Sequence, residues 1–490
     1  MPTLNEPLLD TKLAELEQLR SWSPRVVSKL ESFLRSDDDW ALFRANPYAF
    51  AAERGVSEDE AVDLFLLACK VGLFEMRWSL LCPGCGQAVQ SFSTLKSVCA
   101  VFHCFLCSVD IETCLDDYVH IGFTVSPQIR AIPAHDRDSL TIEDLYMRYH
   151  FALEARDRSG LRFVDMMPSM AQGYGYVEPR SSRVFELDMV DGATAVFDVA
   201  TNSLSSLVVD PGRSSPNPDL TLKLSAGTVN APPILVAPGK LRLAYINDGD
   251  QRAAVVLFGK RLAVLEETQR RMNAGLPPTM TFDKFLSGRR LLTSHTFRQM
   301  FGTETIRSTD GIGVRDVSIL FTDLKGSTEM YDRIGDLKAF ALVNQHFERL
   351  NRAIVRWRGA VVKTIGDAVM ASFETPADAV HAAREMLREI DAFNREVGDR
   401  EIALKVGVHR GASIAVTLNE RLDFFGQTVN VAARVQGLAD AGEIYITDDV
   451  YRAPGVKELL SGFQITPREA SLKGVQRAVS VYRVAAAAPP

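Results

Sequence analysis

The chain has 490 residues, of which 46% are hydrophobic, and a formal net charge of -7 at pH 7. At roughly 150 residues per domain, this length suggests about three domains. The mildly acidic balance argues against nucleic acid as a partner bound through bulk charge. The longest apolar run, AVDLFLLACKVGLF, is too short to span a bilayer and contains Asp63 and Lys70. The first residues, MPTLNEPLLD, lack the basic stretch and apolar core of a signal peptide, so we expect a cytoplasmic protein without a membrane span.

Residues 1–80 are expected to form a helical N-terminal region. Leucines recur at helical spacing over Thr11–Arg20, and the apolar residues of Pro24–Leu34 fall on one face. A further helix is predicted after Ser57, with three acidic residues in its first turn, where they suit the helix dipole. These helices indicate a small packing unit. A DNA-binding helix-turn-helix is the alternative, and the absence of a basic stripe speaks against it.

Four cysteines within the next expected domain, residues 81–136, form two C-x₂-C pairs. These are Cys82 with Cys85 and Cys104 with Cys107. Two such pairs at this separation are typical of a structural zinc ribbon, in which each tight turn directs two thiolates at one ion. A closed four-thiolate Zn²⁺ site leaves no position for water, so we predict a structural and not a catalytic metal. Reduced buried thiols and redox disulfides are the alternatives.

The other residues near these pairs have simpler interpretations. His103 is a possible substitute ligand, but its neighbour Cys104 fits the spacing better. The three remaining cysteines, Cys69, Cys99 and Cys114, are expected to be small buried hydrophobic residues.

Residues 137–280 are expected to form a β-rich domain. After a helical stretch near Ile142–His150, short β-prone runs alternate with turn residues; they are Ser182–Asp188, Thr194–Asp198, Leu204–Val209 and Leu241–Asn247. Asp248-Gly249 between Leu241–Asn247 and Ala253–Phe258 predicts a hairpin. We expect an antiparallel sheet or sandwich. It is either a sensor for an unknown regulatory ligand or protein, or a structural spacer.

Residues 281–313 are expected to form a helical connector. The segment RRLLTSHTFRQMFG predicts one amphipathic helix, and three glycines, Gly302, Gly311 and Gly313, are expected to loosen the chain after it. Such a helix either transmits a change of state to the last domain of the chain or acts as an inert strut.

The segment VSILFTDLKGST begins the last domain, residues 314–485. Val317–Phe321 predicts a buried strand, with Asp323 just past its end, and VVKTIGDAVMASF predicts a hairpin with Asp367 at its tip. Aspartate is common in turns for local conformational reasons, so these two residues could also be simple turn formers. Two carboxylates at neighbouring strand ends, however, are also the ligands that Mg²⁺ prefers.

The remaining elements of this domain alternate between helix and strand. Helices are predicted over Asp336–Arg358 and Ala377–Val397. Six residues of the first have core spacing: Leu337, Phe340, Phe347, Leu350, Ile354 and Trp357. Strands are predicted at Leu404–Val408, Ile444–Ile446 and Ala478–Val484. This order fits a ferredoxin-like α+β sandwich.

Together with LDFFGQTVNVAARV, these ordered motifs make about the last third of the chain resemble the class III adenylate and guanylate cyclase family. The resemblance implies the roles of seven residues: Asp323 and Asp367 bind two Mg²⁺ or Mn²⁺ ions, Lys363 and Asp423 read adenine, Asn430 and Arg434 handle the ribose and the transition state, and Lys473 in SLKGV contacts the triphosphate. Outside this context, Lys363, Asn430 and Arg434 would be ordinary surface residues.

The resemblance further implies an activity, which is conversion of ATP to 3′,5′-cyclic AMP and pyrophosphate by a phosphorus–oxygen lyase. The active form would be a homodimer with two composite sites, regulated by its N-terminal domains. The segment GVHRGASIAVTLNERLDFFG departs from the family's more glycine-rich arm, which affects the expected dimer contacts more than the chemistry. Two rival functions are a catalytically silent nucleotide-binding regulator and a zinc-ribbon interaction protein.

Overall fold

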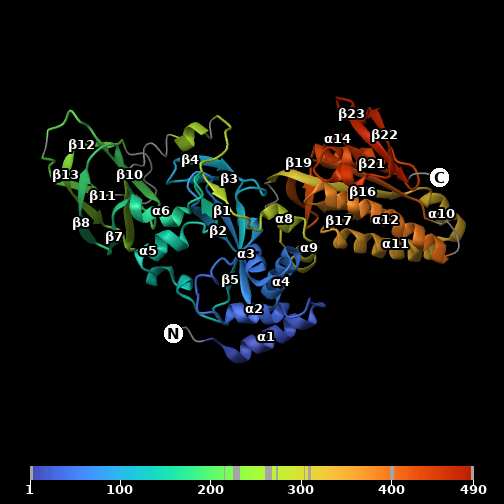
Figure 1. Cartoon of the computed structure of the whole chain (residues 1–490), viewed down its shortest axis with the longest axis horizontal. Helices are drawn as coiled ribbons and strands as arrows, with labels where there is room; N and C mark the ends of the chain where they lie inside the picture. Colours follow the sequence, from blue (N-terminus) through green and yellow to red (C-terminus); the bar gives the residue numbers. More distant parts are fainter. Residues whose placement is uncertain are drawn as a thin grey trace.

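The chain forms three lobes in a row (Figure 1). The computed structural model describes residues 4–214, 216–223, 232–259, 267–271, 274–302, 304–306, 311–397 and 402–486. The N-terminal helices and a small sheet occupy the centre, a β-sandwich lies at one end, and the C-terminal domain lies at the other. The chain passes from the centre to the sandwich and returns through the centre before it enters the C-terminal domain. Within the described ranges, no helix is long and apolar enough to cross a membrane.

The central lobe packs helices against strands. The helices are α1 (Glu6–Gln18), α2 (Val26–Leu34), α3 (Pro47–Arg54) and α4 (Glu58–Val71). The Ser57 side chain caps α4 by accepting the Glu60 amide hydrogen, so this helix begins where the sequence predicts. The sheet joins β2 (Ala88–Phe92), β1 (Phe74–Leu81) and β5 (Val119–Val125).

The expected division at residue 80 falls inside β1, and helices and sheet share one hydrophobic core. The helices are therefore not a separate unit, and the N-terminal part of the chain is β-rich beyond α4. Its smaller elements are η1 (Leu95–Ser97), β3 (Val101–Cys104), β4 (Val109–Glu112), η2 (Pro133–His135), η3 (Arg137–Ser139), α5 (Ile142–Asp144), the π-helical η4 (Leu145–Tyr149), β6 (Ala155–Arg156) and α6 (Phe163–Met170).

The second lobe is a sandwich of two sheets, as the alternating pattern predicts. One has the order β12-β10-β9-β14-β7 and the other β11-β13-β8. The bounds are β7 (Ala171–Val177), β8 (Ser181–Met189), β9 (Ala193–Asp198), β10 (Ser203–Val209), β11 (Leu220–Lys223), β12 (Ile234–Val236), β13 (Gly239–Asn247) and β14 (Ala253–Phe258). Side chains of both sheets form one apolar core between them.

The predicted hairpin around Asp248-Gly249 is wrong. Strand β13 pairs with β8 and β11, whereas β14 pairs with β7 and β9 in the opposite sheet. The cause is Asn247, whose amide donates to the carbonyl oxygens of Val177, Glu178 and Gln251 while its oxygen accepts the Gly249 amide hydrogen. This side chain fixes a corner that carries the chain from one sheet to the other.

The described part of the connector up to Gly302 is docked on the central lobe, with the Leu286 carbonyl accepting the Ile121 amide hydrogen at 2.8 Å. After β15 (Thr281–Phe282) it forms two short helices, α8 (Gly288–Leu292) and α9 (His295–Met300), where one was predicted. The break occurs at Ser294, whose hydroxyl accepts the Phe297 amide hydrogen and starts a new helix. Gly313 lies inside a strand, and its carbonyl accepts the Leu115 amide hydrogen at 3.0 Å.

The C-terminal domain is built on a mixed sheet with the order β17-β18-β16-β19-β21-β23-β22, and β20 pairs with β19. Its strands are β16 (Ile312–Leu324), β17 (Ala360–Ile365), β18 (Ala368–Phe373), β19 (Leu404–Leu418), β20 (Arg421–Phe425), β21 (Ile444–Thr447), β22 (Phe463–Ala470) and β23 (Val479–Ala486). Its helices are α10 (Ser327–Ile334), α11 (Asp336–Arg356), α12 (Pro376–Val397), α13 (Gln427–Gln436), α14 (Asp448–Tyr451) and α15 (Val456–Leu459).

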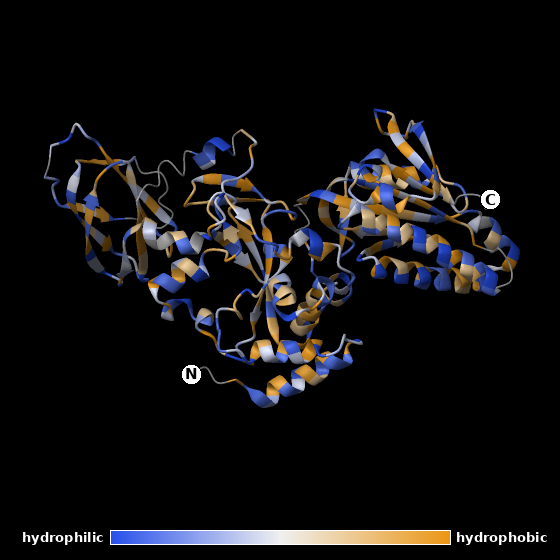
Figure 2. Cartoon of the chain, in the orientation of Figure 1, coloured by the Kyte–Doolittle hydropathy of each residue, from blue (hydrophilic) through white to orange (hydrophobic). Residues whose placement is uncertain are grey.

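Helices α11 and α12 cover one face of this sheet, and Figure 2 shows that much of their outer surface is hydrophilic. The core prediction for α11 holds at Leu350 and Ile354, which are fully buried. It is wrong for Leu337 and Phe340, which are 87% and 60% exposed. The buried side of these first turns is formed by Ala339 and Val343, so Leu337 and Phe340 lie on the outward side of α11. The other face of the sheet packs on α13 and joins the core of the central lobe.

Candidate active site

Two of the predicted site residues, Asp323 and Asp367, lie at the same edge of the C-terminal sheet. Asp323 is the second-last residue of β16, inside the strand and not past its end, and Asp367 occupies the turn between β17 and β18. Strands β16 and β18 are antiparallel with Phe321 opposite Met370, so the end of β16 meets the start of β18. The Val369 amide donates to the Thr322 hydroxyl at 3.1 Å and fixes this junction.

The two carboxylates differ in their partners. Asp323 Oδ2 lies 2.8 Å from the Lys405 ammonium. Asp367 Oδ2 is buried and, among the described residues, has no hydrogen-bond donor. A buried carboxylate oxygen without a partner is destabilising. A hard cation that prefers carboxylate oxygens would supply that partner, so this pair of side chains fits a divalent-metal site.

Lys363 and Asp423 are paired within one chain. Lys363 on β17 places its Nζ 2.6 Å from Asp423 Oδ2 on β20, and Asp423 is only 6% exposed. The second carboxylate oxygen of Asp423 accepts the Phe424 amide hydrogen at 2.8 Å. Lys363 and Asp423, the donor and the acceptor that the sequence suggested for base recognition, are therefore adjacent. Both carboxylate oxygens of Asp423 accept hydrogen bonds.

Asn430, Arg434 and Lys473 gather around α13. Asn430 and Arg434 are four residues apart on this helix and so share a face, and both are exposed. Lys473 follows β22 and is exposed, while the preceding Leu472 packs in a cluster that contains Val431 and Val435 of α13. Within the described ranges, none of the three polar side chains has a hydrogen bond or ion pair, with Asp323 and Asp367 or with any other residue.

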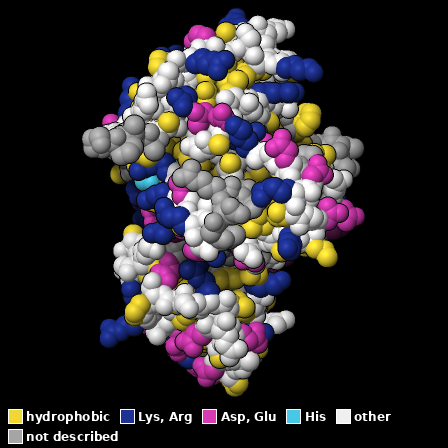
Figure 3. All heavy atoms as spheres, turned by 90° about the vertical axis from the view of Figure 1, so that its right-hand side faces the viewer, with side chains coloured by type: hydrophobic (Ala, Val, Ile, Leu, Met, Phe, Trp, Pro, Cys, Tyr) yellow, Lys and Arg dark blue, Asp and Glu magenta, His cyan; other side chains and the backbone are white. Residues whose placement is uncertain are grey.

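Large apolar side chains come to the surface near these groups. Ile365 beside the Asp367 turn is 52% exposed, and Phe425 at the end of β20 is 63% exposed. Ile414 and Leu418 of the extended β19 are also exposed. Figure 3, which looks onto the C-terminal end of the molecule, shows hydrophobic side chains at the surface among intermingled basic and acidic ones. Exposed apolar groups of this size commonly mark contact surfaces.

One residue that sequence reasoning missed, Arg298 of α9, reaches the strand that carries Asp423. Its Nη1 donates to the Leu422 carbonyl at 2.8 Å, and its guanidinium lies 5.4 Å from the centre of the Phe424 ring. Burial lowers the pKa of Arg298 to about 10, although Asp423 acts in the opposite direction. The sequence offered no clear signal, since the predicted connector helix contains three arginines and other polar residues lie near Arg298.

The four predicted zinc ligands form a second, separate cluster in the central lobe. The thiols of Cys82, Cys85, Cys104 and Cys107 are all buried, and their sulfur atoms lie within 4.8 Å of one another. Cys85 Sγ and Cys104 Sγ are 3.7 Å apart. This closed set of four sulfurs fits a tetrahedral zinc site, and occupancy by zinc stays a prediction.

Local geometry explains why these thiols converge. Cys82 follows β1, and the β3–β4 pair holds Cys104 and Cys107. Gly86 has a φ of +74°, and a Cβ at Gly84 would lie 3.1 Å from the Cys107 sulfur. Both glycines are therefore needed to close the first turn. Burial opposes ionisation of Cys82, but hydrogen bonds from the other three thiols outweigh it and hold its pKa well below the usual value.

The other predictions for cysteines hold in part. Cys114 is buried, whereas Cys69 and Cys99 are half-buried. His103 is not needed as a ligand, since its Nδ1 lies 2.8 Å from the Asp110 carboxylate and Cys104 supplies the fourth sulfur.

Comparison with known proteins gives two family matches and a set of relatives. Residues 9–299 match the family described as "Family of unknown function (DUF5939)", and residues 313–485 match the "Adenylate and Guanylate cyclase catalytic domain". The adenylate cyclase of Anabaena cylindrica is 28% identical over 267 residues, which are 50% of this chain and 53% of that protein. The pH-sensitive adenylate cyclase MT1302 of Mycobacterium tuberculosis is 29% identical over 196 residues, 38% of this chain and 46% of that protein.

The chain thus spans about half the length of these curated relatives. Among solved structures, the adenylyl cyclase CyaB from P. aeruginosa is similar with a TM-score of 0.33 and 19% identity, covering 36% of this chain and 97% of that one. The guanylyl cyclase Cya2 has a TM-score of 0.33 and 20% identity, covering 37% of this chain and 96% of that one. The chain belongs to the family of unknown function DUF5939, and its last third is a class III adenylate and guanylate cyclase catalytic domain.

Proposed function

We propose that this protein is an adenylate cyclase that converts ATP to 3′,5′-cyclic AMP and pyrophosphate. The observation that carries the proposal is the 2.6 Å pair of Lys363 and Asp423 on strands adjoining the Asp323–Asp367 edge. A lysine can donate to an acceptor of the adenine ring, and a carboxylate can accept from the adenine amino group. The curated relatives named as adenylate cyclases support the same choice of base.

Asp323 and Asp367 are the residues that would hold two Mg²⁺ or Mn²⁺ ions. Such ions, when bound, lower the pKa of the attacking ribose hydroxyl and neutralise charge on the pyrophosphate. The unpartnered buried oxygen of Asp367 supports this assignment. Lys405, which neutralises Asp323 in the present arrangement, would move aside as a cation takes its place.

Arg434, Asn430 and Lys473 would bind the rest of the nucleotide. The guanidinium of Arg434 is a permanently charged fork suited to the α-phosphate, where negative charge develops during attack by the 3′-hydroxyl. Asn430, one helical turn earlier, would orient the ribose, and Lys473 would bind the outer phosphates.

We further propose that the active form is a homodimer with two composite sites. No hydrogen bond or ion pair joins the metal-binding carboxylates to Asn430, Arg434 or Lys473 within the described part of one chain. Both groups are flanked by exposed apolar residues, Ile365 beside the first and Phe425 beside the second. Burying these apolar surfaces against a second copy would bring the metal edge of one subunit to the α13 face of its partner.

The test is a cyclase assay on the full-length chain. ATP or GTP is incubated with the purified protein and Mg²⁺ or Mn²⁺, and cyclic nucleotide and pyrophosphate are quantified. Cyclic AMP formed well in excess of cyclic GMP is the expected result. Nucleotide binding without turnover under either metal would instead identify a catalytically silent nucleotide-binding regulator.

A further inference from the structure

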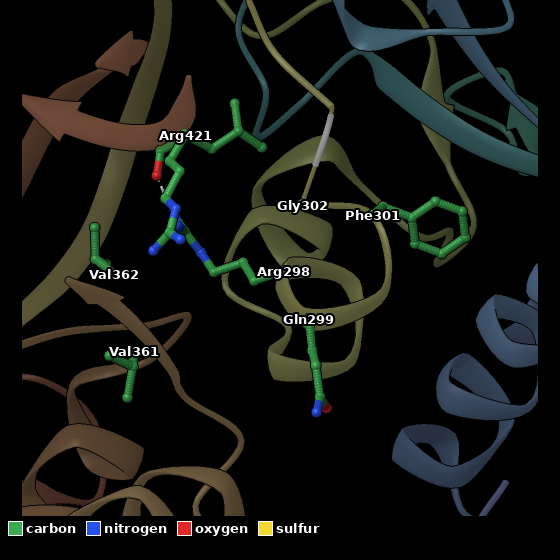
Figure 4. A pocket seen from close by; sticks show the side chains of 8 residues that line it. Arg298, Gln299, Phe301, Gly302, Val361, Val362 and Arg421 are labelled. Carbon is green, nitrogen blue, oxygen red and sulfur yellow. Dashed lines mark hydrogen bonds between the residues drawn. The ribbon is translucent and has the colours of Figure 1, made fainter. Parts of the chain in front are cut away.

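A pocket of about 430 Å³ lies between the connector and the C-terminal domain. One side is formed by the connector residues Arg298, Gln299, Phe301 and Gly302, and the other by Val361, Val362, Arg421 and Leu422 (Figure 4). The pocket therefore separates the segment that leaves the N-terminal lobes from β17 and β20, the two strands that carry Lys363 and Asp423.

Arg298 is incompletely bonded in this pocket. Its Nε donates to the Leu292 carbonyl at 2.7 Å and its Nη1 to the Leu422 carbonyl at 2.8 Å. Its Nη2 is buried and has no acceptor among the described residues. Since a buried donor on a charged group is costly to leave unbonded, Arg298 lacks a partner that an anion would provide.

A second guanidinium, that of Arg421, lines the same pocket. Figure 4 shows the ends of the Arg298 and Arg421 side chains converging between α9 and β17. Arg421 is exposed and, in the part of the chain that the structure describes, its side chain has neither an ion pair nor a hydrogen bond. The pocket lining contains no acidic side chain, and the neighbouring Asp423 is already engaged by Lys363.

The Asp423 carboxylate acts on Arg298 but is shared with Lys363, so two guanidinium groups line the pocket with less than one full negative charge near them. An anion between the two guanidinium groups would offset their positive charge. We propose that the pocket binds a small phosphate-bearing metabolite that regulates the enzyme. A phosphate dianion matches the two positive charges, and guanidinium groups bind phosphate through paired hydrogen bonds. The exposed Arg421 can swing to admit the phosphate to the buried Nη2 of Arg298. A pocket of this size also accommodates a small organic group, for which Val361 and Val362 provide an apolar wall.

A ligand bound in this pocket would change how the enzyme recognises the base of its nucleotide substrate, a consequence that rests on the proposed function. Arg298 holds the Leu422 carbonyl and faces the Phe424 ring, so it contacts both neighbours of Asp423. A phosphate that draws Arg298 toward Arg421 would shift β20 and with it the Asp423 carboxylate. We therefore expect the ligand to change the KM for ATP more than the kcat.

The experiment is isothermal titration of the full-length chain with inorganic phosphate, glucose 6-phosphate and AMP, at constant ionic strength and without added Mg²⁺ or Mn²⁺. At least one should bind, and Arg421→Gln should weaken its affinity by about tenfold or more. Arg468→Gln, which removes an exposed arginine on β22, is the matched control and should bind as the wild type does. Tighter binding of inorganic phosphate identifies free phosphate as the ligand, and tighter binding of the esters identifies a phosphate ester.

Three results would overturn the proposal. They are no binding of any of the three phosphates up to about 10 mM, unchanged affinity in Arg421→Gln, or acetate binding as tightly as phosphate. The Arg434→Ala variant distinguishes this pocket from the catalytic site. Its affinity for phosphate should equal that of the wild type. A loss of phosphate affinity in this variant would mean that the phosphate binds at α13. If the protein shows no cyclase activity but still binds phosphate in a way that depends on Arg421, only the proposed function is refuted.

Discussion

The ammonium of Lys363 lies 2.6 Å from the carboxylate of Asp423, sixty residues further along the chain. This salt bridge joins β17 to β20 and leaves one donor and one acceptor at the same place. Since a base of the substrate presents its own donors and acceptors in a fixed pattern, a pair of this kind can discriminate between bases.

The first prediction changes this pair. Lys363→Glu combined with Asp423→Cys should weaken the preference for ATP over GTP, because the groups facing the base change while Asp323, Asp367 and Arg434 remain. The measurement is the ratio of kcat/KM for the two nucleotides. Lys338→Glu, an exposed charge reversal on α11, should keep the wild-type ratio. A double variant as active and as selective as the wild type would remove both residues from base recognition.

The second prediction concerns the metal-binding edge. Asp323→Ala or Asp367→Ala should abolish cyclase activity and leave the fold intact, because each removes a ligand shared by both ions. Activity and circular dichroism are measured together. Glu458→Ala, which removes an exposed carboxylate on α15, should stay active. Near-normal turnover in either aspartate variant would mean that the catalytic metals bind elsewhere.

The third prediction tests the composite sites. Asp323→Ala and Arg434→Ala chains should each be inactive alone and should regain activity when mixed, up to about a quarter of wild type. In a mixed dimer one site carries both lesions and the other carries neither, and half of the dimers are mixed. The assay is cyclic AMP formation after the two chains are co-refolded or co-expressed. Mixtures as inactive as the separate variants would refute a site shared between subunits.

The fourth prediction concerns the cysteine cluster. Protein purified without added zinc should contain about one zinc per chain, because four buried sulfurs lie within 4.8 Å of one another and four thiolates suffice to bind a structural zinc ion. Elemental analysis checks the content. Cys104→Ala should lose the metal and stability, whereas Cys99→Ala, a half-buried thiol outside the cluster, should keep both. Four freely titrating thiols in the native protein would contradict the zinc site.

The fifth prediction concerns stability in acid. Burial lowers the pKa of His346 from 6.5 to about 4. Between these values the unfolded chain takes up a proton that the folded chain does not, so the free energy of unfolding falls as the pH falls through this window. At about pH 5 this histidine alone should cost on the order of 2 kcal/mol relative to about pH 7.

Urea denaturation at the two pH values provides the measurement. His346→Leu should show a smaller loss of stability on acidification, and Gln345→Leu, an exposed neighbour on α11, should behave as the wild type does. Equal pH dependence in His346→Leu and the wild type would show that this histidine does not titrate abnormally.

The sequence by itself determined the features that depend on a few neighbouring residues. The start of α4 follows from Ser57 and its acidic first turn, and the β17–β18 hairpin follows from two β-prone runs around Gly366-Asp367. The cysteine pairs follow from their spacing. These signals are local because a cap, a turn or a C-x₂-C loop is closed by groups only a few residues apart.

The tertiary structure alone decided which distant segments meet. The sequence predicted a hairpin at Asp248-Gly249, but the bonds of Asn247 to residues some seventy positions earlier send β13 and β14 into different sheets. It predicted core positions at Leu337 and Phe340, but tertiary packing decides which side of α11 faces the sheet, and these two residues lie on the other side. Arg298 donates to the Leu422 carbonyl, 124 residues away. No local sequence pattern encodes this contact, because a long-range contact forms only when the packing of the intervening elements brings its two partners together.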